Sequence, residues 1–521
     1  MSFNIENIDK IDLSNYNLDK YLSDIINYGL EKVWKNIINF NFLNKEIPEI
    51  LSVDNFSELY EIGLGHINKE EKKEMGKYYT PTDVSSLMSK WLKELRGDNI
   101  CDVACGTGRL ILSYLDLIGE EKSIELLKAG KIYLYDIDEL ALNICKYSIG
   151  IKYGMELVGN LHTICDDFLN FELHLPPNCK VISNPPYAKF TQYQLRWEVT
   201  DVMLHTKELY SCFIEKIVRE SESSVIISPF SFIGSEKFYD LRKVLNDYNG
   251  FIISFDNIPG CIFSGRKKGI FNSNVSNSTR AAITVTENKK DKLGYKISPL
   301  IRFKSEERDK ILNKKYLESL VGSEYQLVDK DNKSYYKCFN ELEDIKKRWF
   351  ENSNLRMKDL ISKEKTDYLI CIPNSCRYFT VGSSFELDRS GKYTYYVKDK
   401  ETFDFIYCYM NSSFPYWFWR MYDGGVLYPQ QLLLNNPLFF YQFSKDDMRK
   451  LGYIADGMRS VEKECIVKKL NAGKEQENIK FPTAYREEIN RLFLKVLDSK
   501  EDNSILRIIH KNSMFGEIEW D

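Results

Sequence analysis

The tetrapeptide Asn184-Pro185-Pro186-Tyr187 combines two fixed hydrogen-bond acceptors with an aromatic ring. The residues before it, Lys180–Ser183, are predicted to form a short buried strand, and the two prolines end its ladder of hydrogen bonds and stiffen the turn. A stiff turn holds the Asn184 side-chain oxygen and the Pro185 carbonyl oxygen in one direction, where they match the two N–H donors of an exocyclic amino group. Tyr187 adds a flat face for a stacked base. We therefore predict a pocket for a nucleobase that carries an amino group.

A second group of residues predicts a pocket for a ligand with a cationic amine and a ribose. The segment 102–108 follows a predicted strand and precedes a predicted helix, and its small residues Ala104 and Gly106 let the backbone approach a ligand at the carboxyl edge of the sheet. Asp102 suits a cationic amino group. Asp136 ends the next strand, where it can accept both ribose hydroxyls. The third glycine of a dinucleotide site and the Lys-Ser/Thr of a phosphate loop do not follow, which disfavours a nucleotide phosphate ligand.

Two further segments fit the same pocket. Gly76–Pro81 leads into a helix that is predicted to begin near Thr82 or Asp83, and a free helix N-terminus with the Thr80 hydroxyl suits a carboxylate. Asp167-Phe168 follows the third predicted strand and supplies an acceptor and a ring for an adenine group. Each segment alone also fits a purely structural explanation, such as a capped helix start or a loop acid, so their order along the chain carries the argument.

In that order the segments resemble the motifs of the DNA adenine methyltransferases of the γ arrangement, which use S-adenosylmethionine (SAM). The resemblance covers residues 76–288, with motif X at 76–81, I at 102–108, II at 136–137, III at 167–168, IV at 184–187, V at 210–216 and VI at 224–230, and with Phe263 at the variable motif VIII. It implies SAM as the cofactor, bound by Tyr79, Thr80, Pro81, Asp102, Ala104, Gly106, Asp136, Ile137, Asp167 and Phe168. The departures are Cys105 and the run Gly106-Thr107-Gly108 in motif I.

The same resemblance implies a reaction and its catalytic residues, Asn184, Pro185, Pro186 and Tyr187. Acceptors on Asn184 and Pro185 would hold both hydrogens of the adenine amino group and free the nitrogen lone pair for methyl transfer. A base inside a duplex has to rotate out to reach such a site. Tyr187 and Phe263 would then stack on the base, and Lys267 and Lys268 would contact the DNA.

The chain of 521 residues is long enough for two or three domains. Residues 1–75 are predicted to form a helical segment, because apolar residues recur at spacings of three and four. Residues 76–288 alternate apolar runs with amphipathic stretches, which predicts a Rossmann-like α/β methyltransferase domain with a parallel sheet. Residues 289–521 mix short aromatic strands with helices and are predicted to form an α+β target recognition domain.

The amino-acid composition indicates the cellular environment and the binding partners of the protein. No stretch is long and apolar enough for a membrane span, and the start of the chain lacks a signal peptide, so we expect a cytoplasmic, DNA-associated bacterial protein. Twelve cysteines without a Cys-x-x-Cys pair and five scattered histidines predict no metal site. The net charge is −4, yet residues 265–315 hold 14 Lys/Arg against 5 Asp/Glu. This basic segment is either a flexible connector or, as its position favours, a surface that contacts DNA phosphates.

Sequence reading is assigned to the C-terminal region through the resemblance. Its candidate base-reading side chains are Arg377, Arg420, Gln430, Gln431 and Asn435. The aromatic run 414–419 has the residue types that stack on bases, but a packed core segment is the preferred interpretation.

Several alternatives stay open at this point. Methylation of the cytosine amino group needs almost the same site, although Asn rather than Ser at position 184 favours adenine. Protein-glutamine and ribosomal RNA methyltransferases share the Asn-Pro-Pro-Tyr motif but usually lack a large C-terminal domain. A DNA-binding module on a decayed methyltransferase fold is the non-enzymatic alternative. Double-stranded DNA is the expected partner, and a cognate restriction endonuclease or a specificity subunit is a further candidate.

Overall fold

An eight-stranded sheet with the strand order β3-β2-β1-β4-β5-β7-β6-β8 organises the first part of the chain. Strands β3, β2, β1, β4 and β5 are mutually parallel, whereas β7 runs antiparallel between β5 and β6. The strands are β1 (Asn99–Val103), β2 (Ile132–Asp136), β3 (His162–Cys165), β4 (Cys179–Ser183), β5 (Ser223–Pro229), β6 (Asn249–Phe255), β7 (Ala281–Thr286) and β8 (Gly294–Ile301). This mostly parallel sheet confirms the predicted α/β fold.

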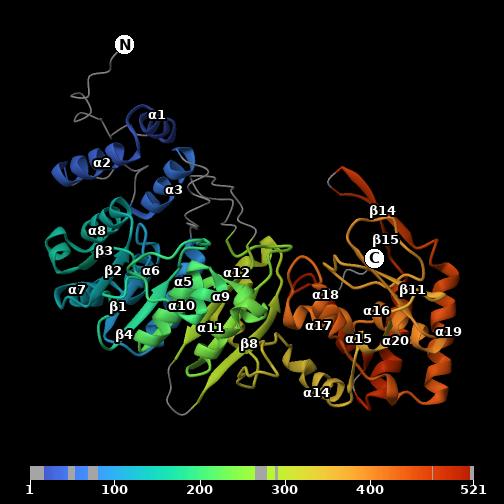
Figure 1. Cartoon of the computed structure of the whole chain (residues 1–521). Helices are drawn as coiled ribbons and strands as arrows, with labels where there is room; N and C mark the ends of the chain where they lie inside the picture. The colour runs from blue at the N-terminus through green and yellow to red at the C-terminus, as the bar shows by residue number, and fades with distance from the viewer. Residues whose placement is uncertain are drawn as a thin grey trace. The chain divides into compact units, whose positions relative to one another are not determined.

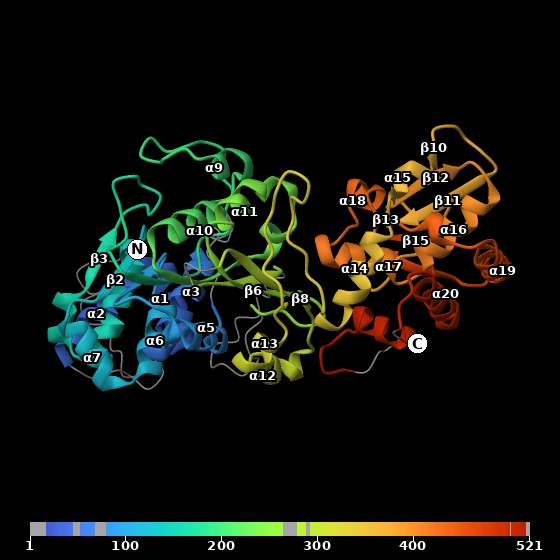
Figure 2. The ribbon, with the colours of Figure 1, turned by 90° about the horizontal axis from the view of Figure 1, so that it is seen from below.

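The central strands are short apolar runs because both of their faces are covered. All five residues of β4 are buried, and so are the last four of β1. The helices along this part of the chain are α5 (Thr82–Glu94), α6 (Arg109–Ile118), α7 (Glu120–Lys128), α8 (Glu139–Tyr153), α9 (Asp201–Thr206), α10 (Leu209–Glu220) and α11 (Tyr239–Leu245). Figure 2 shows α10 and α11 on one side of the sheet and α5 and α6 on the other.

The N-terminal part of the described chain is helical, as predicted. Its helices are α1 (Leu18–Tyr28), α2 (Leu30–Asn44) and α3 (Phe56–Ile67), drawn in blue in Figure 1. Trp34 and Phe56 share a hydrophobic core with Ile144 and Tyr147 of α8, and the rings of Phe56 and Tyr147 stack with centroids 6.0 Å apart. These helices therefore pack on the crossover helix that follows β2.

The computed structural model describes residues 17–44, 53–67, 80–263, 279–287, 292–471, 473–500 and 502–516. The chain divides into two compact units. The first comprises Met1–Lys296 and Arg308–Ser334, and the second comprises Ile297–Glu307 and Tyr335–Asp521. The segment that rejoins the first unit carries α12 (Arg308–Ile311) and α13 (Lys314–Ser319). Within the described ranges, no helix has the length and apolar character needed to span a bilayer.

The second unit has its own hydrophobic core, formed by helices and small sheets. Its helices are α14 (Glu343–Glu351), α15 (Met357–Leu360), α16 (Lys400–Asn411), α17 (Phe414–Tyr422), α18 (Gln430–Leu434), α19 (Lys445–Val461) and α20 (Thr483–Val496). Its strands are β9 (Leu355–Arg356), β10 (Ile361–Ser362), β11 (Tyr368–Pro373), β12 (Lys392–Val397), β13 (Pro437–Leu438), β14 (Ile466–Asn471) and β15 (Lys474–Ile479). Short strands and helices are thus mixed in this unit, as predicted.

Side-chain burial in the second unit tests two predictions about base reading. Phe414, Tyr416, Trp417 and Trp419 are all at most 1% exposed, which confirms that this aromatic run is a core segment. Arg420 is 4% exposed and donates to the Leu300 carbonyl oxygen at 2.7 Å. The prediction that Arg420 reads a base is therefore wrong, because its guanidinium is used inside the core. Sequence reading by residues 289–521 stays a prediction.

Candidate active site

Asp102 and Asn184, two of the predicted site residues, lie where β1 and β4 run side by side at the carboxyl edge of the sheet. The strand order reverses between these two strands, and such a switch point is where open α/β sheets bind ligands. Ser183 at the end of β4 donates its hydroxyl to the Val103 carbonyl oxygen at the end of β1, with an O···O distance of 2.5 Å. This bond sets the turn at Asn184 against the turn that follows β1.

The turn after β1 has a backbone that glycine and alanine permit. Ala104, Gly106 and Gly108 all have positive φ angles, of 62°, 53° and 89°. A Cβ atom at Gly108 would lie 2.5 Å from the Cys145 sulfur, so a larger residue cannot be accommodated without a shift. A Cβ atom at Gly106 would meet nothing within 4 Å. The backbone at Gly106 is therefore open to a ligand, as predicted for a cofactor loop.

Asp136 connects the turn after β1 with the turn after β2. Its Oδ2 accepts a hydrogen bond from the Gly106 N–H at 2.6 Å, and its Oδ1 accepts from the Asp138 N–H at 2.8 Å. Asp138 caps α8 by accepting from the Ala141 N–H at 3.1 Å. The exposed side chain of Ile137, 68% accessible, lies between these two acids in sequence. The two turns thus form one hydrogen-bonded unit with an apolar residue at its surface.

Helix α3 forms a side-chain hydrogen bond with the turn after β1 and another with the turn after β2. The Tyr60 hydroxyl donates to Asp138, and the Thr107 hydroxyl donates to the Ser57 hydroxyl at 2.8 Å. Sequence reasoning missed both contacts, since Ser57 and Tyr60 belong to a helical segment to which no role was assigned. A helical pattern reports which face is buried and does not indicate which loop that face supports.

Asp102 is completely buried at the end of β1. Its Oδ2 accepts from the Ile111 N–H at 3.1 Å, whereas its Oδ1 has no hydrogen-bond partner among the described residues. Burial raises the pKa of Asp102 to about 8, and the nearby charge of Asp136 adds to this increase. A buried carboxyl with an open acceptor is suited to a cationic amine, which would compensate its charge.

Asn184 is oriented by a residue from the start of α5. Its Nδ2 donates to the Thr80 hydroxyl at 2.9 Å, so its Oδ1 is directed elsewhere as the acceptor side of the amide. Thr80 is 4% exposed, and α5 begins directly afterwards at Thr82, as predicted. The structure therefore brings Thr80, which the sequence assigned to the cofactor, into contact with the residue that the sequence assigned to the amine.

Tyr187 and Phe263 lie in contact beside this turn. Their ring centroids are 5.9 Å apart with an interplanar angle of 68°, an edge-to-face arrangement. The Tyr187 hydroxyl donates to the Ile227 carbonyl oxygen at 3.3 Å. The two aromatic residues predicted to stack on the base are thus neighbours, but no parallel gap separates their rings. A base can enter between them only after one ring has moved.

The turn after β3 has a more crowded geometry. Asp167 accepts from the Trp197 indole N–H at 2.6 Å and from the Leu169 N–H at 3.0 Å. Phe168 is 3% exposed and packs against Tyr135. The predicted contacts of Asp167 and Phe168 with the cofactor's adenine stay predictions, and an adenine amino group at Asp167 would share its acceptor with Trp197. Sequence reasoning missed Trp197.

Other predicted binding residues fall outside this geometry. Tyr79, Lys267 and Lys268 lie outside the described residues. Of the basic segment 265–315, Arg280 pairs with Asp256 at 2.8 Å and Arg308 pairs with Asp83 at 2.6 Å, so these two arginines have structural roles.

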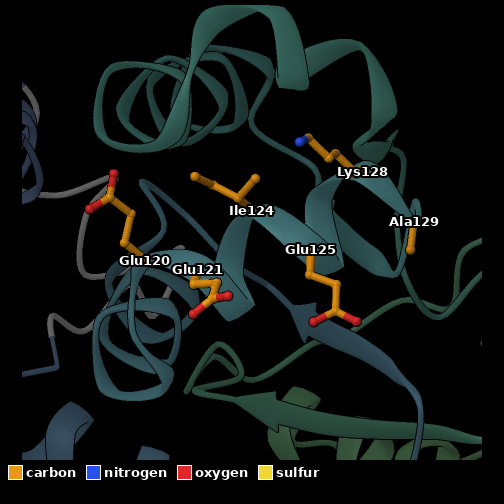
Figure 3. A pocket seen from close by; sticks show the side chains of 6 residues that line it. All are labelled: Glu120, Glu121, Ile124, Glu125, Lys128 and Ala129. Carbon is orange, nitrogen blue, oxygen red and sulfur yellow. The ribbon is translucent and has the colours of Figure 1, made fainter.

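A hollow on α7 is not a candidate for the ligand-binding site (Figure 3). It is lined by Glu120, Glu121, Ile124, Glu125, Lys128 and Ala129. Helix α7 ends shortly before β2 begins, so the hollow lies toward the amino edge of the sheet, away from the turns described above. Its three carboxylates also repel a polyanion. Across the described ranges, no group of three or more His, Cys, Asp or Glu side chains is placed to hold a metal ion.

Comparisons with known proteins point to one family. The profile described as "N-6 DNA Methylase" matches residues 51–366. The methylase subunit of the type I restriction enzyme MpnII from Mycoplasma pneumoniae is 24% identical over 371 residues, covering 61% of this chain and 65% of that protein. The type II methyltransferase M.BanIII from Aneurinibacillus aneurinilyticus is 31% identical over 140 residues, 23% of each protein. Among solved structures, the DrdV–DNA complex covers 78% of this chain and 59% of that chain, with 13% identity and a TM-score of 0.46. The chain spans less than two thirds of the length of the curated relatives that it matches.

Proposed function

We propose that this chain, which belongs to the N-6 DNA methylase family, transfers a methyl group from SAM to the exocyclic amino nitrogen of adenine in double-stranded DNA. The observation that carries the proposal is the placement of Asn184. Its amide is oriented by Thr80 at the carboxyl end of β4, beside the turn that holds Asp102 and Gly106. The residues proposed to accept the amine and to hold the cofactor therefore share one edge of the sheet.

The residues around Asp102 fit SAM. The buried Oδ1 of Asp102 offers an acceptor to the cationic amino group of its methionine part, and the open space at Gly106 admits a ligand against the backbone. Asp136 stands at the end of β2 for the ribose hydroxyls, and the exposed Ile137 offers an apolar surface to the adenine ring. Bound SAM supplies an electrophilic methyl group. The chain itself supplies the alignment.

The chemistry of the chain's own residues concerns the amine. Its lone pair is delocalised into the base, and this makes the nitrogen a poor nucleophile. The Asn184 Oδ1 and the Pro185 carbonyl oxygen would accept its two hydrogens, draw the nitrogen toward tetrahedral geometry and stabilise the positive charge that develops on it. Alignment of the reacting atoms contributes up to about 7–11 kcal/mol, so a strong general base is not required.

The target base must leave the duplex to reach Asn184. Unpairing and unstacking cost a few kcal/mol, and stacking on Tyr187 and Phe263 would offset this cost with about 1–3 kcal/mol per contact. The two rings are in edge-to-face contact, so base entry has to separate them. Lys267, Lys268 and their basic neighbours are proposed to contact the DNA phosphates nearby.

A restriction–modification system is the proposed setting. The Mycoplasma pneumoniae relative is a methylase subunit of a type I restriction enzyme, and M.BanIII is a type II methyltransferase. By this analogy the chain acts on DNA in the cytoplasm of a bacterium, together with a specificity subunit or a cognate restriction endonuclease. The described exposed side chains Arg377, Gln430, Gln431 and Asn435 remain the proposed readers of the target sequence.

Replacing Asn184 tests the proposal. The variant Asn184→Ala should bind SAM and DNA normally but transfer methyl groups about 100- to 1,000-fold more slowly, the usual cost of removing one preorganised polar group from a site of developing charge. Asn246→Ala is the matched control. Asn246 also uses both ends of its amide, donating to the Val328 carbonyl oxygen at 2.7 Å and accepting from the Val328 N–H at 3.0 Å, but it lies outside the site. That variant should lose stability and keep its turnover.

Mass spectrometry of nucleosides from the treated DNA separates the remaining alternatives. N6-methyl-2′-deoxyadenosine supports the proposal, and N4-methyl-2′-deoxycytidine would replace it with cytosine methylation. Wild-type protein that binds SAM but methylates only protein or RNA would refute the choice of substrate. Near-normal turnover by Asn184→Ala would refute the assignment of the catalytic residue.

A further inference from the structure

Arg308 is a buried arginine whose guanidinium binds two segments that are far apart in sequence. It is 5% exposed and is the first residue of the segment by which the chain rejoins the first unit. Its Nε donates to Asp83 Oδ2 at 2.6 Å and its Nη2 donates to Asp83 Oδ1 at 2.9 Å. Its Nη1 and Nη2 also donate to the carbonyl oxygens of Cys261 and Ile262, at 3.0 and 2.7 Å. These four bonds use almost the full donor capacity of the side chain.

The first segment leads to Asn184. Asp83 lies in the first turn of α5, three residues after Thr80, whose hydroxyl accepts from the Asn184 amide at 2.9 Å. Holding Asp83 fixes the beginning of this helix. The beginning of the helix in turn fixes Thr80, and Thr80 sets which end of the Asn184 amide faces the amine.

The second segment leads to Tyr187. The Cys261 and Ile262 carbonyl groups directly precede Phe263, whose ring contacts that of Tyr187 with centroids 5.9 Å apart. Fixing the two carbonyl groups fixes the backbone from which the Phe263 ring projects. Arg308 therefore connects to both ends of the turn 184–187, through Thr80 at the Asn184 end and through Phe263 at the Tyr187 end.

We propose that Arg308 is a positioning residue for methyl transfer, which holds the amine acceptor and the base-stacking ring in register by binding Asp83 and the carbonyl groups of residues 261 and 262. The inference rests on the proposed function. It extends the catalytic machinery to residues 308–334, beyond the predicted boundary at 288. Arginine is needed because its planar fork binds a carboxylate with two parallel bonds and keeps donors for the carbonyl groups, whereas a lysine ammonium cannot reach all four acceptors in one geometry.

A simpler account is that Arg308 only stabilises the fold, and the chain offers a matched control for it. Arg242 is also a buried arginine of the first unit, and it donates to the carbonyl oxygens of Phe232, Ser235 and Lys333 at 2.5, 3.0 and 2.7 Å. None of these three bonds leads to the turn 184–187. Arg242→Lys should thus reproduce the loss of a buried guanidinium without the loss of register.

The test compares Arg308→Lys, Asp83→Asn and Arg242→Lys in the full-length protein. For Arg308→Lys we expect kcat to fall about 100-fold, the typical effect of a misplacement near 1 Å. Asp83→Asn should also lower kcat, and the double variant should be no worse than Arg308→Lys because the bonds that Asp83→Asn weakens are among the four that Arg308→Lys breaks. Arg242→Lys should lower the melting temperature and leave kcat at the wild-type value.

A second measurement does not depend on turnover. Hydrogen exchange at the amides of residues 82–86, 261–263 and 187 should accelerate in Arg308→Lys and stay unchanged in Arg242→Lys. Unchanged exchange at residue 187, an unchanged kcat for Arg308→Lys, or equal losses of kcat in the two lysine variants would each overturn the inference. Absence of DNA methylation by the wild-type protein would instead refute the proposed function, and the exchange data would still decide the role of Arg308.

Discussion

Lowering the pH from 7 to 6 should weaken SAM binding about tenfold, because Asp102 must lose its proton to receive the cationic amine of the cofactor. Asp102 is fully buried, and burial raises the pKa of its carboxyl to about 8 in the free protein, with a smaller contribution from the charge of Asp136. With that pKa, about 1% of the protein carries an ionised Asp102 at pH 6 and about 9% at pH 7, so the apparent affinity follows the ionised fraction.

Calorimetry measures this coupling directly. Titrations of SAM between pH 6 and 7.5, in two buffers with different ionisation enthalpies, give both the Kd and the number of protons released. At pH 7 nearly one proton should leave per SAM bound, because about nine tenths of the free protein is protonated at Asp102. The α-amino group of the ligand titrates near pH 8, so it is mostly charged up to pH 7, and its own deprotonation must be included in the fit at pH 7.5.

The variant Asp102→Asn serves as the control. It should bind SAM weakly at every pH and release no proton, because its amide neither ionises nor compensates a cation. A wild-type Kd that is constant from pH 6 to 7.5, or an Asp102→Asn variant that retains the pH dependence, would refute the assignment of Asp102 to the amine.

The same pKa has a consequence for the stability of the free protein. In the unfolded chain the carboxyl of Asp102 titrates at its ordinary pKa of 3.8, and in the folded protein at about 8. Between these values the folded state binds more protons than the unfolded state, so stability falls as the pH rises, by at most about 1.4 kcal/mol per unit. Asp102→Asn should flatten this slope in chemical denaturation between pH 5 and 8.

Three further substitutions test the surroundings of the site. Tyr60→Phe removes the hydroxyl that donates to Asp138, and its loss of one hydrogen bond should weaken SAM binding about fivefold by calorimetry while circular dichroism stays unchanged. Trp197→Phe removes a donor that occupies Asp167, so SAM should bind more tightly if Asp167 receives the adenine amino group, and a weaker affinity would contradict that assignment. Phe263→Ala should reduce the fluorescence change of 2-aminopurine at the target base, because a stacking contact of about 1–3 kcal/mol is lost, and an unchanged signal would show that Phe263 does not contact the base.

The sequence alone predicted the elements at the carboxyl edge well. Strand β4 was expected at residues 180–183 and is observed at Cys179–Ser183, one residue longer. Local signals suffice for such elements, because a buried strand is a short apolar run and a proline or an acid marks its end. The sequence also predicted that the turns at Asp102, Asp136 and Asn184 lie at one edge of the sheet, because parallel strands bring their carboxyl ends together there.

The supporting contacts could not be predicted in this way. Arg308 binds Asp83 across 225 positions, and Tyr60 binds Asp138 across 78. Such pairs leave no periodic pattern in the sequence. Each partner lies in a helix or caps one, and the local pattern of that helix does not depend on the distant residue. Arg420 illustrates the opposite error. The sequence predicted that this arginine binds a base, but in the structure its donors bind the Leu300 carbonyl group and the Tyr416 hydroxyl.

The division of the chain into units bears on how the second unit could be exchanged between related proteins. Residues 297–307 belong to the second unit although residues 308–334 belong to the first, so the second unit is joined to the first through more than one crossing of the chain. A recombination event that replaced everything after Lys296 would also remove Arg308 and α13 from the first unit. Exchange of the second unit alone would therefore require three crossovers, at 296/297, 307/308 and 334/335, or a parent in which the returning segment already matches its new host.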